Sequence, residues 1–97
     1  MSAHLLHFEW DEQKALLNLR KHGVSFEEAS LSFFDERFIR RVDIKHSVYE
    51  TRYGGIGRIT SGKLLVTTYT ERGDNIRIIS SRKANKKEKL DYENFKE

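Results

Sequence analysis

The stretch that decides the fold opens with Phe8-Glu9-Trp10-Asp11 and closes with Lys21-His22-Gly23-Val24-Ser25-Phe26-Glu27-Glu28-Ala29. Residues 5–10 are typical of a short strand, and Asp11 has a side chain that caps the first turn of a helix. Gly23 readily adopts the left-handed conformation found at helix ends. The stretch therefore predicts a strand, a first helix and, directly after Gly23, a second helix.

Both helices carry further signals. In the first, Ala15, Leu16 and Leu19 share one face, and we expect this face to be buried. In the second, Ser25 and Glu28 have the spacing of a capping box, in which each side chain satisfies a free backbone N–H group near the helix start. These signals place the boundary between the two helices just before the capping box.

After Asp35 the apolar pattern changes from a period near 3.6 to a period of two. Strands are predicted over residues 38–44, 49–59, 63–70 and 75–81, with short polar or glycine-containing connections that favour an antiparallel meander. From residue 84 the chain is rich in Lys and Glu, which predicts a last amphipathic helix with a frayed end. We expect residues 1–97 to form one α+β domain in the order β-α-α-β-β-β-β-α.

The composition restricts the class of protein. A chain of 97 residues can build only one modest core. It contains no apolar run of membrane-spanning length and no signal-type N-terminus, so we expect a cytoplasmic protein with no membrane partner. The absence of cysteine agrees with a reducing compartment.

Charge is distributed unevenly along the chain. Residues 1–36 carry three Lys/Arg and seven Asp/Glu, whereas residues 37–97 carry fifteen Lys/Arg and eight Asp/Glu. The later strands and the last helix should therefore have a positive potential, for which a polyanion is the natural partner. The alternative is an ordinary solvated surface rich in lysine.

Arg77 interrupts an apolar strand. It must leave the core or meet an anion, because an unpaired buried charge is costly. A phosphate matches the guanidinium group, and a salt bridge to Glu50 or Glu71 is the alternative. Strict alternation along the strand would place Arg77 and Arg82 on opposite faces of the sheet.

Other basic residues are candidates for phosphate contacts. Arg82 leads into a basic segment that includes Lys83, Lys86 and Lys87. Arg58 follows a glycine-rich stretch that does not precede a helix and is not a nucleotide-binding loop. The glycines instead suggest a bulge or a close backbone approach that presents Arg58 at the edge of a concave sheet. An ordinary exposed strand arginine is the alternative.

His22 and Lys21 end the first helix. Imidazole is the side chain whose unperturbed pKa lies closest to neutrality, so His22 is a candidate for proton transfer. Alternatively, His22 donates to the free carbonyls at the helix end. His46 is a second candidate. We expect Trp10 to pack between the first helix and the sheet, with stacking on a base as the alternative. The histidines lack partners at ligand spacing, so no metal site is expected.

Taken together, these motifs resemble the BrnT family of bacterial toxins over about residues 7–95. The resemblance is carried by Trp10-Asp11, Lys14, Asn18-Leu19, Lys21-His22-Gly23-Val24, Phe26, Ile56-Gly57-Arg58, the strand from Arg77 to Arg82, and the Arg82-x-Ala84 step toward Glu88. It implies a fold similar to the RelE ribonuclease toxins, in which a twisted antiparallel sheet packs against two N-terminal helices and a C-terminal helix.

The resemblance also implies an activity and a partner. It implies RNA cleavage without metal or cofactor, inhibition of translation and growth, and neutralisation by a BrnA-like antitoxin. Two toxins would bind one antitoxin dimer, and DNA would be contacted only through the antitoxin.

The mechanism that this suggests is attack of a ribose 2′-hydroxyl on the neighbouring phosphate. Arg58 and Arg82 would stabilise the developing charge, Arg77 would contact a phosphate, and His22, helped by Lys21, would move protons. Two alternatives remain open: an RNA-binding module without catalysis, and a regulatory domain whose positive face holds an acidic partner protein.

Overall fold

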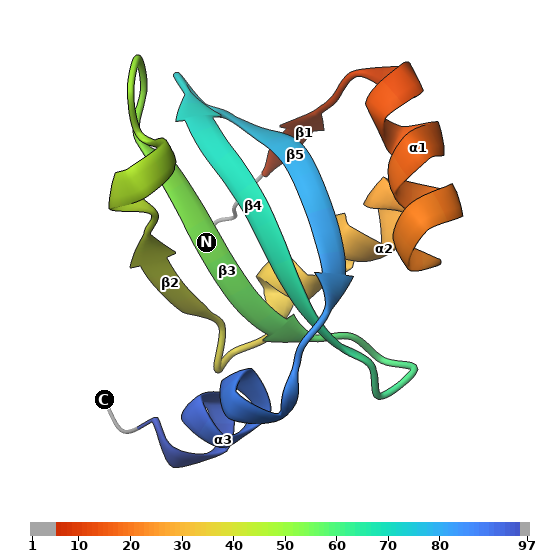
Figure 1. Ribbon diagram of the computed structural model, residues 1–97, viewed down its shortest axis with the longest axis vertical. Helices are drawn as coiled ribbons and strands as arrows, with labels where there is room; N and C mark the ends of the chain where they lie inside the picture. The colour runs from red at the N-terminus through yellow and green to blue at the C-terminus, as the bar shows by residue number, and fades with distance from the viewer. Residues whose placement is uncertain (1–5, 96–97) are drawn as a thin grey trace.

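The computed structural model describes residues 6–95, which form a five-stranded sheet with helices at its back and at its edges (Figure 1). The elements in chain order are β1 (His7–Glu9), α1 (Glu12–His22), α2 (Phe26–Leu31), the 3₁₀ turn η1 (Ser32–Phe34), β2 (Ile39–Val42), the 3₁₀ turn η2 (Ile44–His46), β3 (Arg52–Arg58), β4 (Leu64–Arg72), β5 (Asn75–Lys83) and α3 (Lys86–Asn94). The α+β fold and the predicted order of strands and helices are confirmed.

The strand order in the sheet is β1-β5-β4-β3-β2. Strands β2 to β5 form the antiparallel meander that the sequence predicts. β1 is different, because it pairs with β5 in parallel over a short register from His7 opposite Asn75 to Glu9 opposite Arg77. The sheet is therefore antiparallel in its main part, with one parallel strand added at the edge.

Several boundaries differ from the sequence prediction. β2 ends at Val42 and β3 begins at Arg52, because the residues between them fold into η2 and a polar turn. In this turn the Ser47 hydroxyl donates to the Asp43 carbonyl at 2.6 Å and accepts from the Arg52 N–H at 2.9 Å. At the chain ends, Leu5 of the first predicted strand and residues 96–97, the last of the chain end that was expected to fray, lie outside the described residues. Among residues 6–95, no helix is long and apolar enough to cross a membrane.

The glycines of β3 allow close packing of the segment before β2. A Cβ atom on Gly55 would overlap the Phe38 ring, and one on Gly57 would overlap the Ser32 carbonyl. This supports the predicted close backbone approach and explains why Gly55 and Gly57 carry no side chain. Phe38 in turn stacks on Phe33, with ring centroids 4.8 Å apart.

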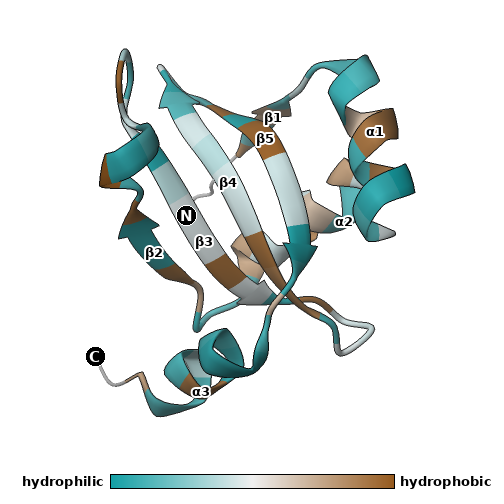
Figure 2. Ribbon diagram, in the orientation of Figure 1, coloured by the Kyte–Doolittle hydropathy of each residue, from teal (hydrophilic) through white to brown (hydrophobic). Residues whose placement is uncertain are grey.

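The main core lies between the sheet and α2. Phe26 of α2 is fully buried and is contacted edge-on by Trp10, with ring centroids 5.9 Å apart. A second cluster lies on the other face of the sheet, where Tyr92 of α3 packs with Ile56 and Leu64. α3 is coloured almost entirely as hydrophilic in Figure 2, and Tyr92 is its buried residue.

The expected buried face of α1 is wrong for its two leucines, whereas Ala15 does pack against the core. Leu16 and Leu19 are 56% and 46% exposed, whereas the buried residue of the helix is Asn18. The reason is that α1 does not lie flat on the sheet but runs beside the edge of β5 (Figure 1). Its contact with the sheet is narrow and is centred on Ala15 and Asn18.

Asn18 pairs with the edge of β5 as a neighbouring strand would. Because β1 reaches only as far as Arg77, the later part of β5 has no strand on that side among the described residues. The Asn18 amide accepts from the Ser81 N–H at 3.0 Å and donates to the Ser81 carbonyl at 2.8 Å. It also donates to the Val24 carbonyl at 2.9 Å. One side chain thus joins α1, β5 and the connection that leads into α2.

We expect Asn18→Ala to lower the free energy of unfolding by about 2–4 kcal/mol, because it leaves several buried backbone groups without partners. Urea unfolding of this variant and of Gln13→Ala, an exposed position on the same helix, would measure the difference. A midpoint for Asn18→Ala equal to that of the control would show that the amide does not hold α1 to the sheet.

Candidate functional site

A bulge in β5 determines which side chains share a face. The register between β4 and β5 shifts at Thr68/Tyr69, and Ile79 is left without a partner. Arg77 is opposite Thr70 and Arg82 is opposite Val66, and these two residues of β4 point the same way. The expectation that Arg77 and Arg82 lie on opposite faces is therefore wrong, because strict alternation does not allow for the extra residue.

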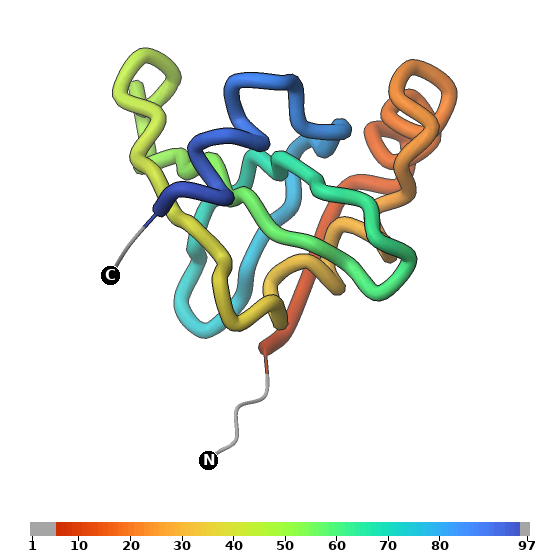
Figure 3. The backbone as a smooth tube through the Cα atoms, turned by 90° about the horizontal axis from the view of Figure 1, so that it is seen from below, coloured from red at the N-terminus to blue at the C-terminus, as the bar shows by residue number. Residues whose placement is uncertain are grey.

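We call the sheet surface turned away from α2 the open face. In Figure 3, α1, α3 and the segment containing η2 all lie on this side of the sheet. Registers across the strands place the following polar residues on it: Arg41, Arg52, Arg58, Thr68, Thr70, Arg77, Ser80 and Arg82. The open face is thus a basic surface with helical or looped walls.

Arg77 is held by an ion pair at the edge of this face. Its guanidinium group donates to Glu9 at 2.9 Å, and the hydrogen bonds from Asn75 and Arg77 lower the pKa of the Glu9 carboxyl. A salt bridge was the predicted alternative for Arg77, and it is present, but its partner is Glu9. Glu50 and Glu71 pair with Arg72 and Arg40 instead. Glu9 reaches Arg77 because β1 pairs with β5.

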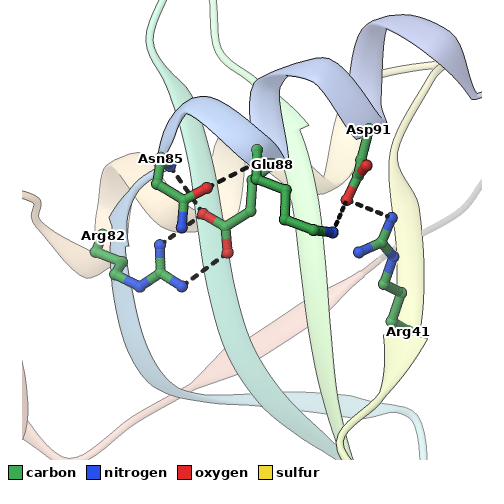
Figure 4. Close-up of polar contacts among 6 residues, drawn as sticks. Arg41, Arg82, Asn85, Glu88 and Asp91 are labelled. Carbon is green, nitrogen blue, oxygen red and sulfur yellow. Dashed lines mark hydrogen bonds and ion pairs between the residues drawn. The ribbon is translucent and has the colours of Figure 1, made fainter.

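Arg82 is bound by α3 (Figure 4). Both oxygens of Glu88 accept from the Arg82 guanidinium at 2.8 Å, and Glu88 also accepts from the backbone N–H of Asn85 at the helix start. The hydrogen bond with Arg82 lowers the pKa of Glu88 despite partial burial. Asp91, one turn further along α3, pairs with Arg41 at 3.3 Å. α3 therefore brings two carboxylates over the arginines of the open face.

Arg58 and Arg82 have different partners. The Arg58 backbone N–H donates to Asp35 at 2.7 Å, its guanidinium donates to the Gly62 carbonyl at 2.9 Å, and the same group lies 5.4 Å from the centroid of the Tyr92 ring. Arg58 and Arg82 thus contact different residues of α3, Tyr92 and Glu88.

His22 and Lys21 line a cavity of about 200 Å³ between α1 and β5, which we call the α1–β5 pocket. Lys14 and Ser80 line the same pocket, and Ser80 belongs to the open face. Within the described chain, His22 makes no hydrogen bond to the helix-end carbonyls, and the Gly23 N–H bonds to the Leu19 carbonyl instead. The pocket therefore gathers cationic side chains beside the arginine-bearing strand.

Lys14 was missed as a site residue, although the sequence contains a signal for it. Lys14 and Lys21 are seven residues apart, which is two helical turns, so they lie on the same side of α1. Strand alternation already places Ser80 on the same face as Arg82, but the sequence does not show that α1 lies beside it.

The remaining predicted residues are dispersed. Lys83 lines a second basic pocket with Arg58, Lys86 is exposed, and Lys87 pairs with Asp91 at 3.2 Å. Trp10 packs in the core on the α2 side and therefore does not line the open face. His46, the second histidine candidate, pairs with Asp43 at 2.9 Å, and this hydrogen bond lowers the pKa of Asp43.

Fold and site together define a class of small α+β proteins whose sheet presents a basic face to solvent. A sequence model described as "Ribonuclease toxin, BrnT, of type II toxin-antitoxin system" matches residues 10–88. The chain therefore belongs to the BrnT family of ribonuclease toxins, whose systems pair such a toxin with an antitoxin.

A solved structure supports the fold. The 1.1 Å crystal structure of the Brucella abortus ribonuclease toxin BrnT matches with a TM-score of 0.60 and 21% sequence identity, over 86% of this chain and 100% of that one. At this identity the likeness concerns the fold alone. No curated protein matches the sequence.

The Arg82–Glu88 pair predicts a pH-dependent contribution to stability. The lowered pKa of Glu88 means that this contribution is complete above the unfolded-state pKa, about 4.3, and is lost as the pH falls through the lower folded-state value. We expect Glu88→Gln to be about 0.5–1 kcal/mol less stable than the parent at pH 7 and the difference to shrink below about pH 4.

Urea unfolding between pH 7 and pH 3 would test this expectation. Gln at this position keeps the capping-box geometry, so the variant removes mainly the charge. Glu93→Gln on the same helix is the matched control, because Glu93 forms no ion pair within the described residues. A stability difference for Glu88→Gln that stayed constant over this pH range would contradict the assignment.

Proposed function

We propose that this chain is a metal-independent endoribonuclease whose chemical step takes place where the α1–β5 pocket meets the open face. The observation that supports this most strongly is the shared position of Ser80, which lines the pocket holding Lys21 and His22 and lies between Arg77 and Arg82 on β5. A phosphate above Ser80 would meet arginines from the strand and a proton-transfer group from the helix.

The proposed reaction is attack of a ribose 2′-hydroxyl on the adjacent phosphorus, with departure of the 5′-oxygen of the next nucleotide. His22 takes the proton from the 2′-hydroxyl, and Lys21 supplies one to the leaving oxygen. The products are a 2′,3′-cyclic phosphate and a 5′-hydroxyl. Arg82 stabilises the charge that develops on the phosphate oxygens, and Arg77 binds a neighbouring phosphate.

The other predicted residues have supporting roles in this proposal. Arg58, at the far end of β3, contributes charge stabilisation by binding the RNA strand rather than by touching the same phosphate as Arg82. Lys83, Lys86 and Lys87 hold the backbone where it leaves the sheet. Trp10 is available for stacking on a base only where its partly buried ring reaches the surface.

Glu88 affects this mechanism, because its carboxylate already accepts two hydrogen bonds from the guanidinium group of Arg82. A phosphate is also a bidentate acceptor for arginine and competes with Glu88 for the same donors. RNA binding then weakens the attachment of α3.

The biological setting that we propose follows the family. RNA cleavage in the cytoplasm inhibits translation and growth, and a BrnA-like antitoxin prevents it. Two toxins bind an antitoxin dimer, and any DNA contact is made by the antitoxin. The positive charge of residues 37–97 supports an RNA substrate.

We expect His22→Ala and Arg82→Ala each to reduce the rate of RNA cleavage about 10²–10³-fold or more, since each removes a proton-transfer group or a charge-stabilising donor. The assay uses antitoxin-free protein, RNA and a chelator, with analysis of the product ends. His46→Ala is the matched control, because His46 lies outside the pocket. Circular dichroism would show that each variant is folded. Full activity in both folded variants would exclude this site.

We expect the double variant Lys86→Ala/Lys87→Ala to weaken RNA binding for all sequences alike and to reduce the salt dependence of the binding constant, because phosphate contacts carry little sequence information. Lys45→Ala, on η2, is the control. Binding without cleavage products in the parent would favour the non-catalytic RNA-binding module, and negligible RNA affinity would favour the regulatory protein-interaction domain.

A further inference from the structure

An apolar pocket lies where the end of α2 and η1 meet the end of β3 and Tyr92 of α3. Its volume is about 450 Å³, and its walls include Leu31, Phe34 and Ile59. Leu31 and Phe34 are 52% and 59% exposed. Large apolar side chains that line a cavity while remaining this exposed are typical of a binding surface.

The carboxylate in this pocket already has its hydrogen-bond partners. Asp35 accepts hydrogen bonds from the Tyr92 hydroxyl and from the backbone N–H groups of Arg58 and Arg37. Burial raises the pKa of Asp35, but these bonds lower it by more, so the carboxyl remains a charged acceptor with its partners in place. The other polar side chains that line it include Thr60 and Arg58, while Leu31, Phe34 and Ile59 make its walls mostly apolar. The pocket is better suited to an aliphatic or aromatic side chain.

A basic pocket of about 410 Å³ adjoins the apolar one, and Arg58 lines both. Lys63, Lys83 and Lys89 also line it, with Glu93 as its carboxylate. Lys63 pairs with Glu28 at 2.9 Å, whereas Lys83 and Lys89 form no ion pair within residues 6–95. An apolar cavity with a positive neighbour is complementary to an apolar side chain followed by carboxylates.

We propose that these two adjoining pockets dock a segment of the antitoxin, with an apolar anchor in the first and an acidic stretch in the second. The proposal rests on the toxin–antitoxin part of the proposed function and does not depend on RNA cleavage. It also suggests how the partner inhibits. Tyr92 and Lys89 of α3 line the pockets, so a segment bound there holds α3 on the open face, where Glu88 occupies Arg82.

The test uses the complete chain and the small protein encoded by the neighbouring reading frame. Leu31→Glu puts a charge at the mouth of the apolar pocket, and we expect it to weaken binding of that protein about thirtyfold or more. Leu16→Glu is the matched control, because Leu16 is similarly exposed, at 56%, but lies on α1. Lys89→Ala should slow association and reduce its salt dependence. RNA cleavage by free Leu31→Glu protein should be unchanged.

Each outcome decides the proposal. Equal effects of Leu31→Glu and Leu16→Glu, or no effect of either, would overturn it, as would the absence of any complex with the parent chain. Loss of RNA affinity in Leu31→Glu with unchanged binding of the partner would assign the pocket to a nucleobase instead. If the parent failed to cleave RNA while Leu31→Glu still lost the partner, the docking site would stand and the ribonuclease mechanism would fail.

Discussion

The hydrogen bonds of one buried amide hold the molecule together where its elements would otherwise separate. Asn18 bonds to both backbone groups of Ser81 and to the Val24 carbonyl, so a single side chain fixes α1, the free edge of β5 and the start of α2. Ser81 also contacts Thr67 through its hydroxyl at 2.9 Å. Because α1 is anchored there, its basic side comes to lie beside Ser80, and the α1–β5 pocket is a consequence of this contact.

Local signals predicted much of the fold. The Asp11 cap, the left-handed Gly23 and the Ser25–Glu28 capping box are all present, because each depends only on residues a few positions apart. The buried side of α1 was wrong for the opposite reason. The periodic pattern favoured the face of Ala15, Leu16 and Leu19. The helix instead lies beside a strand edge, where the free backbone groups of β5 need the hydrogen bonds that Asn18 supplies.

In the candidate site, too, the placement of residues that are neighbours in sequence could be predicted, whereas contacts between distant residues could not. Lys21 and His22 are adjacent in sequence, and the structure brings them into one pocket. The common face of Arg77 and Arg82 depends on a bulge in β5, and the pairing of Arg77 with Glu9 depends on a parallel strand contributed from the other end of the chain. Neither the common face nor the pairing with Glu9 is indicated by residues nearby in sequence, so strand alternation alone could not predict them.

α3 contacts arginines from three strands of the sheet. Its side chains contact Arg82, Arg41 and Arg58 through Glu88, Asp91 and Tyr92, although only one residue of the helix is buried. A helix held mainly by partly exposed ion pairs and one aromatic ring is easier to displace than one held by an apolar face, because such ion pairs contribute little stability in water. The charged groups of α3 can therefore exchange with other anions on the open face, whereas α1, fixed by buried hydrogen bonds, stays in place.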